Sequence, residues 1–198
     1  MPSSVGERRP SGDDIVELAW RCLPPSHRQL LESIGAAQFR VVVRALGDAI
    51  TELRRSGGHR VLTPAQRAHH NDALAPWDRE LRIVLINEAH PKLAGLDDST
   101  REQFLSRLAW HEWAHALSIE RCSHDDVDAG KRLLELAPPG IRDGIRAAGY
   151  RSSEYTHELI AEIYAVLMSR RLRRQGGRPE WLDDQIYNLV ARVTGWSE

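Results

Sequence analysis

The chain has 198 residues, of which 41% are hydrophobic and 28% charged, and its formal net charge is −1. A chain of this length can bury a sizeable core as one domain, and its near-neutral charge gives no electrostatic reason to expect a nucleic-acid partner. Six tryptophans argue against general disorder, and two cysteines are too few for a disulfide framework.

The first twelve residues are polar and lack the apolar segment of a signal peptide. No later stretch is both long and apolar enough to cross a bilayer. We therefore expect a flexible N-terminus over residues 1–12, no membrane partner and a cytoplasmic location.

Residues 13–58 are predicted to form an N-terminal helical layer. A first helix ends at Pro24-Pro25, and Ser26 can cap a second. Apolar residues from Val41 to Leu53 predict a third helix, which ends at Gly57-Gly58. A DNA-reading helix-turn-helix is less expected here, because none of these helices has a distinct basic recognition face.

The pattern of residues 59–95 predicts β-structure in place of helix. The β-branched run Leu81–Asn87 predicts a strand, and Ala75–Asp78 before it can form a preceding strand and turn, so we expect a small hairpin or sheet. An exposed edge at this place could bind an extended peptide by adding a strand. His69-His70 and His90 are interpreted as loop histidines at the surface.

The segment His111-Glu112-Trp113-Ala114-His115 has the pattern H-E-x-x-H. On a helix, histidines four residues apart lie on one face about one turn apart, so both imidazoles can bind a single zinc ion. Glu112 lies about 100° around the helix from His111, where its carboxylate can reach a water on the metal. A third ligand must come from elsewhere in the chain.

The surroundings of this motif predict a buried helix. Ser99 and Glu102 form a capping-box pattern at its start. Trp110, Trp113 and Leu117 add a second apolar stripe, and a helix that is apolar on two sides is expected in the interior. Buried imidazoles and carboxylates need partners there, because an unsatisfied buried polar group costs about 1–3 kcal/mol.

Residues 123–149 are polar, with short helices predicted around Lys131–Leu136 and Ile141–Ala148. The cluster His124–Asp128 could ligate a metal, but a solvated helix start with Asp caps is the commoner role of such a cluster. Cys122 could also be a ligand, although a small buried hydrophobic residue is the usual role of a free cysteine.

A second buried helix is predicted over Glu154–Met168, where apolar residues cover almost the whole circumference. Glu158 and Glu162 share one stripe of this helix with Tyr155. Two carboxylates on a buried helix repel each other unless a cation or hydrogen-bond donors face them. Glu158 can complete a zinc site, and Glu162 can accept a hydrogen bond from a ligand histidine. A metal-free His–Glu network or an arginine pair is the alternative.

The C-terminal part carries a basic stretch, Arg170–Arg174, and a last helix that is predicted to begin at Pro179–Trp181. The arginines are interpreted as a solvated helix end that favours the negative pole of the helix dipole, in preference to an RNA site.

The motifs His111–His115 and Glu158-Leu-Ile-Ala-Glu162 together resemble the gluzincin group of zinc metallopeptidases, which have H-E-x-x-H on one helix and E-x-x-x-D/E on another. The likeness covers about residues 77–168. It is closer to compact members and to the catalytic domain of anthrax lethal factor, whose second helix also reads E-x-x-A-E. The chain is much shorter than thermolysin-like members and shows no clear match to their separate catalytic histidine.

The resemblance implies that His111, His115 and Glu158 bind Zn²⁺ and that Glu112 is the catalytic base. The family often supplies a tyrosine shortly before the glutamate ligand, where its hydroxyl stabilises the oxyanion. Tyr150 fits this position best, and Tyr155 is the second choice.

We therefore expect a mainly helical α+β, zincin-like fold with a small β-sheet upstream of the H-E-x-x-H helix. Residues 59–198 would form the catalytic domain, as one compact unit with residues 13–58. The expected activity is zinc-dependent hydrolysis of peptide or protein substrates. The alternative is a non-catalytic zincin-like module that keeps zinc or a buried His–Glu network to bind a partner, and a purely helical scaffold would bind no zinc.

Overall fold

The computed structural model describes residues 10–36, 39–75, 77–78, 80–119, 121–175 and 177–197. Its helices are α1 (Gly12–Arg21), α2 (Pro25–Ser33), α3 (Leu46–Ser56), α4 (Pro64–Asn71), α5 (Asp98–Ser118), α6 (His124–Leu133), α7 (Pro139–Ala147), α8 (Tyr155–Leu172) and α9 (Asp184–Thr194). Short 3-10 turns lie at Pro91–Leu93 and Leu134–Leu136, and the strands are β1 (Phe39–Val42), β2 (Trp77–Asp78) and β3 (Ile83–Asn87).

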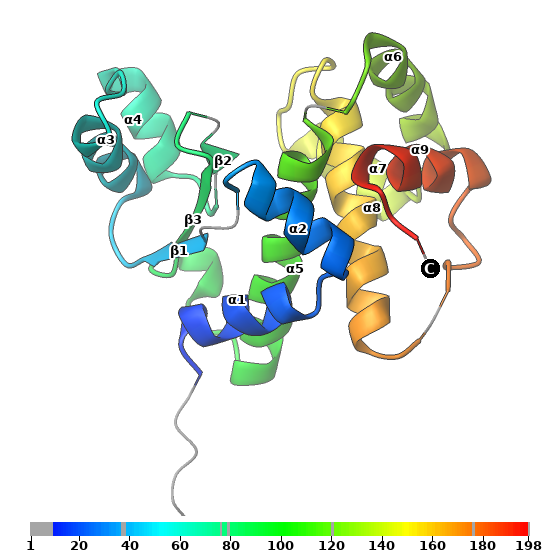
Figure 1. Ribbon diagram of the computed structural model, residues 1–198, viewed down its shortest axis with the longest axis horizontal. Helices are drawn as coiled ribbons and strands as arrows, with labels where there is room; N and C mark the ends of the chain where they lie inside the picture. The colour runs from blue at the N-terminus through cyan, green and yellow to red at the C-terminus, as the bar shows by residue number, and fades with distance from the viewer. Residues whose placement is uncertain are drawn as a thin grey trace, which may run out of the picture.

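The predicted mainly helical α+β fold, with a small sheet before the motif helix, is confirmed. The sheet and the helices α3 and α4 form one half of the molecule, and α6 to α9 form the other (Figure 1). The long helix α5 lies between the two halves. Within the described residues, no helix is long and apolar enough to span a membrane.

The sheet has the strand order β1-β3-β2, with β1 parallel and β2 antiparallel to β3. Every residue of β3 is buried, and its side chains alternate between two clusters. Val84 and Ile86 face the main core, while Ile83 and Leu85 face a smaller cluster with helix α3. The predicted strand over Leu81–Asn87 is thus present at Ile83–Asn87, and it is the central strand of the sheet, between β1 and β2.

Three expectations for the N-terminal half are wrong. Ser26 does not cap α2, because the N-cap position is Pro24 and no side-chain hydrogen bond caps the helix. Val41 and Val42 belong to strand β1, because they pair with Ile86 and Asn87 of β3, so helix α3 begins only at Leu46. The histidine pair at positions 69 and 70 lies in helix α4 and not in a loop. That helix begins with a capping box from Thr63 and with proline at its first position, both strong start signals.

Acidic residues take part in capping the starts of three later helices. Asp97, not Ser99, caps α5, because its carboxylate accepts the backbone N–H of Thr100 at 2.9 Å and suits the positive end of the helix. Asp183 caps α9, which therefore begins later than Pro179–Trp181. The acidic cluster after Cys122 is a helix start, in which Asp126 closes a capping box and binds Arg192.

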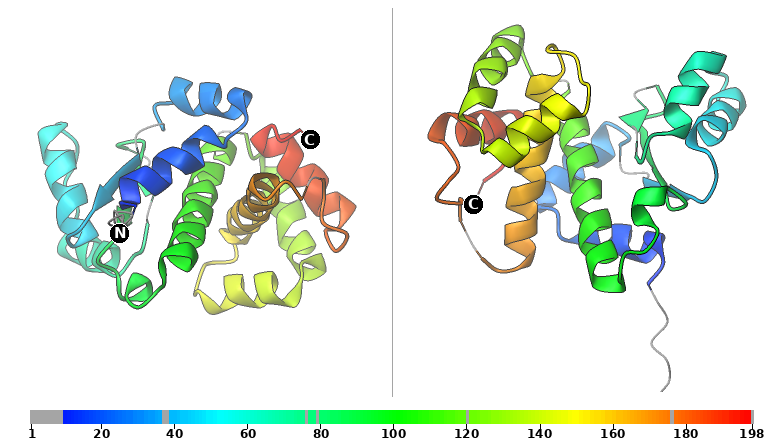
Figure 2. Two further views of the ribbon diagram at one scale, coloured as in Figure 1. Left: turned by 90° about the horizontal axis from the view of Figure 1, so that it is seen from below. Right: turned by 180° about the vertical axis from the view of Figure 1, so that it is seen from behind.

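Helices α5 and α8 pack side by side at the centre of the main core, as both expected buried helices should (Figure 2). Helices α1 and α2 cover α5, and α6, α7 and α9 pack against α8. Fully buried Trp110, Trp113 and Tyr164 fill the space around the pair, and the indole N–H of Trp110 donates to the carbonyl of Ala19 at 3.0 Å. This packing fixes the two helices that carry the candidate site.

Candidate metal centre

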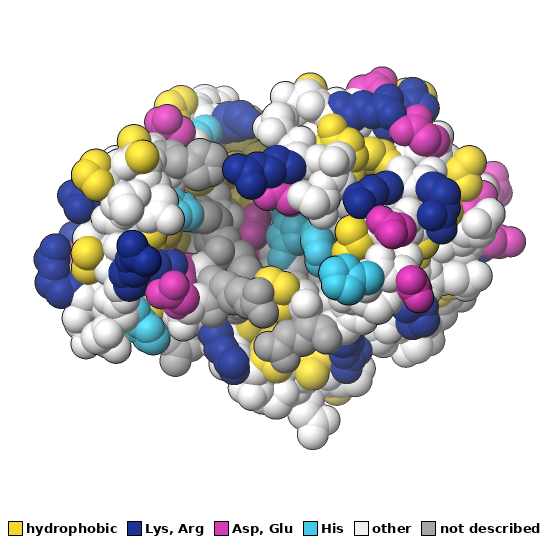
Figure 3. Space-filling model, turned by 90° about the horizontal axis from the view of Figure 1, so that it is seen from above, with side chains coloured by type: hydrophobic (Ala, Val, Ile, Leu, Met, Phe, Trp, Pro, Cys, Tyr) yellow, Lys and Arg dark blue, Asp and Glu magenta, His cyan; other side chains and the backbone are white. Residues whose placement is uncertain are grey.

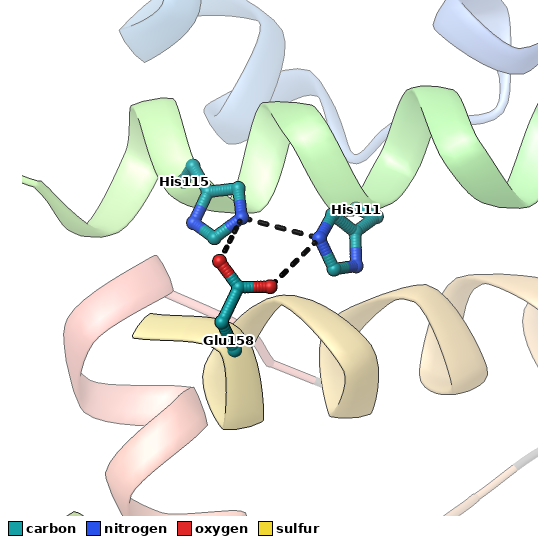
Figure 4. Close-up of side chains that lie close together, drawn as sticks. All are labelled: His111, His115 and Glu158. Carbon is teal, nitrogen blue, oxygen red and sulfur yellow. Dashed lines mark hydrogen bonds and ion pairs between the residues drawn. The ribbon is translucent and has the colours of Figure 1, made fainter. Parts of the chain in front are cut away.

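Three potential ligands meet where α5 and α8 face each other. His111 and His115 lie one turn apart on α5, and Glu158 lies near the start of α8; their side chains point toward one another (Figure 4). Contacts join residue 111 to 158, residue 107 to 162 and residue 103 to 173, so the two helices run in opposite directions. The three residues predicted as metal ligands are therefore brought together by the fold.

The ligand atoms are spaced closely enough to share one metal ion. The Nε2 atoms of His111 and His115 are 3.1 Å apart, and each lies 3.5 Å from an oxygen of Glu158. Ligand atoms about 2.0–2.1 Å from a tetrahedral zinc ion are separated by about 3.3–3.4 Å. The two contacts to Glu158 involve different oxygens, Oε2 for His111 and Oε1 for His115, and one ligand atom from each of the three residues lies within 4.8 Å of the others. The three side chains are therefore placed to hold one metal ion.

The surroundings shift the pKa values of the two histidines in opposite directions. Burial lowers the pKa of His111, but hydrogen bonds to Glu158 and Glu162 outweigh it and raise the pKa to about 10. Burial and the neighbouring charge of His111 lower the pKa of His115 to about 4. A single proton on His111 therefore provides positive charge where a metal ion would sit, and the same contacts suit a metal site or a His–Glu network.

Glu112 differs from its neighbours because it has no partner. Its side chain is only 8% exposed, and it forms no hydrogen bond or ion pair with any described residue. Burial raises the pKa of its carboxyl group to about 8, although the charge of His111 opposes this shift. The oxygens of Glu112 are not enclosed, so this position suits a water molecule or ligand beside the histidines.

Glu162 holds His111 from the opposite side of the ring. Its Oε1 lies 3.3 Å from Nδ1 of His111, and its Oε2 accepts a hydrogen bond from Nη2 of Arg107 at 2.7 Å. Burial raises the pKa of Glu162, but His111 and Arg107 reverse this effect and bring the pKa to about 2. Sequence reasoning missed Arg107, whose signal is its place one turn before His111 on the same helix face.

The two candidate tyrosines lie in different surroundings. The hydroxyl of Tyr150 lies near Glu158, and burial together with that carboxylate raises the pKa of Tyr150 above its usual range. Tyr155 is half-buried against the main core. Tyr150 lines the cavity at the site, whereas Tyr155 is not among its lining residues.

A cavity of about 640 Å³ opens beside two of the ligands, His111 and Glu158. Its polar wall comes from α5 and α8, and its apolar wall comes mainly from α7, which the sequence did not connect to the motifs. The lining residues are Arg107, His111, Pro138, Gly140, Ile141, Gly144, Ile145, Ala148, Tyr150, Glu158, Glu162, Val166 and Trp181. Viewed from above, histidine and acidic side chains lie in a hollow between the two halves of the molecule (Figure 3).

The other candidate ligands lie elsewhere. Among the described residues, His111, His115 and Glu158 are the one group of three or more side chains placed to hold a metal ion. Cys122 is a half-buried free thiol, and His90 caps the turn at Pro91–Leu93.

No protein-family model, curated protein or solved structure matches the chain. The functional argument therefore depends on the site itself. The structure supports a zincin-like group of two histidines and one glutamate, from two packed helices, that is able to hold a metal ion.

Proposed function

We propose that the chain is a zinc-dependent metallopeptidase in which Glu112 is the general base. The observation that carries this proposal is the meeting of His111, His115 and Glu158 beside the buried carboxylate of Glu112, which has no partner among the described residues. A purely structural network would have no need of an unpaired buried carboxylate next to it.

Zinc is the metal that this donor set favours. Two imidazoles and one carboxylate, with one position left open, are the ligands of a catalytic zinc site. When bound, zinc lowers the pKa of a coordinated water to about 7 and polarises the carbonyl group of the substrate.

The protein's own groups handle the protons and the charge. Glu112 takes a proton from the attacking water and passes it to the leaving amine. The Tyr150 hydroxyl, which lies near Glu158, lines the cavity at His111 and Glu158 and donates to the oxyanion that develops on the substrate. Glu162, braced by Arg107, accepts from Nδ1 of His111 and keeps Nε2 directed at the metal position.

The substrate would be a peptide or protein segment. The cavity beside the ligands has an apolar wall of Ile141, Ile145, Val166 and Trp181, which suits an apolar side chain next to the scissile bond. A folded protein would need an exposed, extended segment to reach the site.

The deciding experiment combines metal analysis with peptide hydrolysis. We expect about one zinc per chain and cleavage of a mixed peptide library, and we expect Glu112→Gln to keep its zinc while turnover falls by about 10²–10⁴-fold. Glu102→Gln, on the same helix but away from the cavity lining, is the matched control and should keep full activity.

Two outcomes would contradict the proposal. Bound zinc without turnover on any peptide would favour the non-catalytic binding module. A folded wild-type chain that binds no zinc would leave the group as a structural His–Glu network.

A further inference from the structure

A second cavity, of about 390 Å³, adjoins the one at the metal group. It lies between the first turns of α5 and the last turns of α8, and it shares Arg107 and Val166 with the first cavity. The two cavities therefore lie next to each other along the antiparallel helix pair, with Arg107 and Val166 between them. We call this second cavity the distal groove.

The distal groove is basic. Its lining includes three arginines and no acidic residue: Thr100, Gln103, Phe104, Ser106, Arg107, Trp110, Val166, Ser169, Arg170, Leu172, Arg173 and Gln175. Arg107 is paired with Glu162. Arg170 donates to the carbonyls of Gln175 and Gly177, and Arg173 donates to the side-chain amide of Gln103, so neither is neutralised by a carboxylate among the described residues.

The distance from the metal group to these charges sets the reach of a bound peptide. His111 and Gln103 are eight residues apart on α5, which corresponds to about 12 Å along the helix axis. An extended peptide advances about 3.3 Å per residue, so it would cover this distance in about four residues.

We propose that the distal groove binds the acidic segment of the substrate, with Asp or Glu side chains about three to five residues from the bond that is cut. The position of the cut relies on the proposed peptidase function, but binding in the groove can be measured without it. The guanidinium groups of Arg170 and Arg173 have donors to spare, and arginine matches carboxylates with two parallel hydrogen bonds.

A carboxylate-bearing peptide suits this groove better than a nucleic acid does. The walls between the arginines include the apolar side chains of Phe104, Val166 and Leu172, which give an extended peptide chain something to pack against. The formal net charge of −1 provides no broad positive field of the kind that draws a polyanion.

The test measures binding of labelled peptides to full-length, zinc-loaded Glu112→Gln by fluorescence anisotropy, so that cleavage does not interfere. Each peptide is acetylated at its N-terminus, amidated at its C-terminus and carries a central Leu. The residues that lie three to five positions before or after this Leu are all Glu, all Gln or all Lys. We expect a Glu peptide to bind about tenfold more tightly than its Gln counterpart at low salt, and this advantage to shrink as salt is raised.

Matched double variants locate the effect. Arg170→Gln/Arg173→Gln should weaken binding of the Glu peptide about three- to tenfold. Arg171→Gln/Arg174→Gln removes the same charge from the same helix end but outside the groove lining, and it should bind like the parent. Arg170 also donates to the carbonyls of Gln175 and Gly177, so replacing it can disturb the loop after α8. The single variant Arg173→Gln, at an exposed side chain, tests the charge while those two hydrogen bonds stay in place.

Equal binding of Glu and Gln peptides, or equal losses in the two double variants, would overturn the inference whatever the turnover of the enzyme. Stronger competition by a short RNA than by the Glu peptide would do the same. Preferential binding of the Glu peptide, together with no cleavage by the zinc-loaded wild type, would instead uphold the groove and refute the peptidase proposal.

Discussion

Two buried histidine clusters in this molecule have opposite electrostatics. His27 on α2 is 2% exposed; its Nδ1 shares a hydrogen bond of 2.7 Å with the hydroxyl of Tyr164, and its ring lies beside Trp196. Burial lowers the pKa of His27, and Arg121 and Arg171 lower it further. His111, by contrast, has a carboxylate on each side of its ring, and its pKa is raised.

The contrast teaches that burial alone does not make a histidine a metal ligand. His27 faces a neutral phenol, so nothing there attracts a cation, and its role is to join α2, α8 and the C-terminal segment. His111 and His115 face Glu158, with Glu112 and Glu162 near enough to influence their charges. What distinguishes the candidate metal site is the concentration of negative charge around imidazoles that point at one place.

The largest expected difference between the clusters is in zinc binding. His115→Ala removes one of three ligands and should abolish stoichiometric binding, together with the stabilisation that zinc confers on the wild type, which is about 4 kcal/mol at a thousandfold excess over Kd. His27→Ala should still bind zinc. Calorimetric titration and thermal melts with and without zinc measure both effects, and loss of zinc from the His27 variant would contradict the separation.

A pair of tyrosines near the candidate metal site sharpens the comparison. Tyr150→Phe should lower kcat about 10²-fold while zinc stays bound, because it removes a hydrogen-bond donor from the cavity at the ligands. Tyr155→Phe is the matched control and should leave kcat unchanged, because Tyr155 does not line that cavity. If only the Tyr155 variant lost activity, Tyr155 and not Tyr150 would be the oxyanion donor.

Tyr164→Phe tests the structural cluster. It leaves the buried Nδ1 of His27 without its partner, so unfolding should require about 1–3 kcal/mol less free energy. Zinc affinity and kcat should not change. Urea unfolding measures the first quantity, and a variant as stable as the wild type would show that the hydrogen bond contributes nothing net.

The smallest expected effect is a pH dependence from His27. Its pKa is lower in the folded state than in the unfolded state, so the unfolded chain binds more protons as pH falls below about 6.5. Stability is therefore full above that pH and declines below it, by at most about 1.4 kcal/mol per pH unit. In His27→Phe this part of the decline should vanish. Comparing both proteins in chelator cancels the titration of the metal group, and identical slopes would refute the assignment.

Several elements were predictable because their signals are local. The helices around H-E-x-x-H and around Glu158 were predicted from apolar residues on more than one face, and both are the buried centre of the core. Errors arose where distant segments decide. Val41 and Val42 have an apolar spacing that suits a helix, but they form β1 because β3 offers a partner more than forty residues later in the chain.

The sequence by itself determined the chemistry of the candidate site: which helix face carries His111 and His115, and which stripe of a second helix carries Glu158 and Glu162. A helix repeats every 3.6 residues, so side chains four apart share a face whatever surrounds them. Only the tertiary structure decided that Glu162 and Arg107 brace His111, that α7 walls the cavity and that a basic groove lies next to it. Those contacts join segments without a shared local pattern, and they exist because the antiparallel packing of α5 on α8 brings them together.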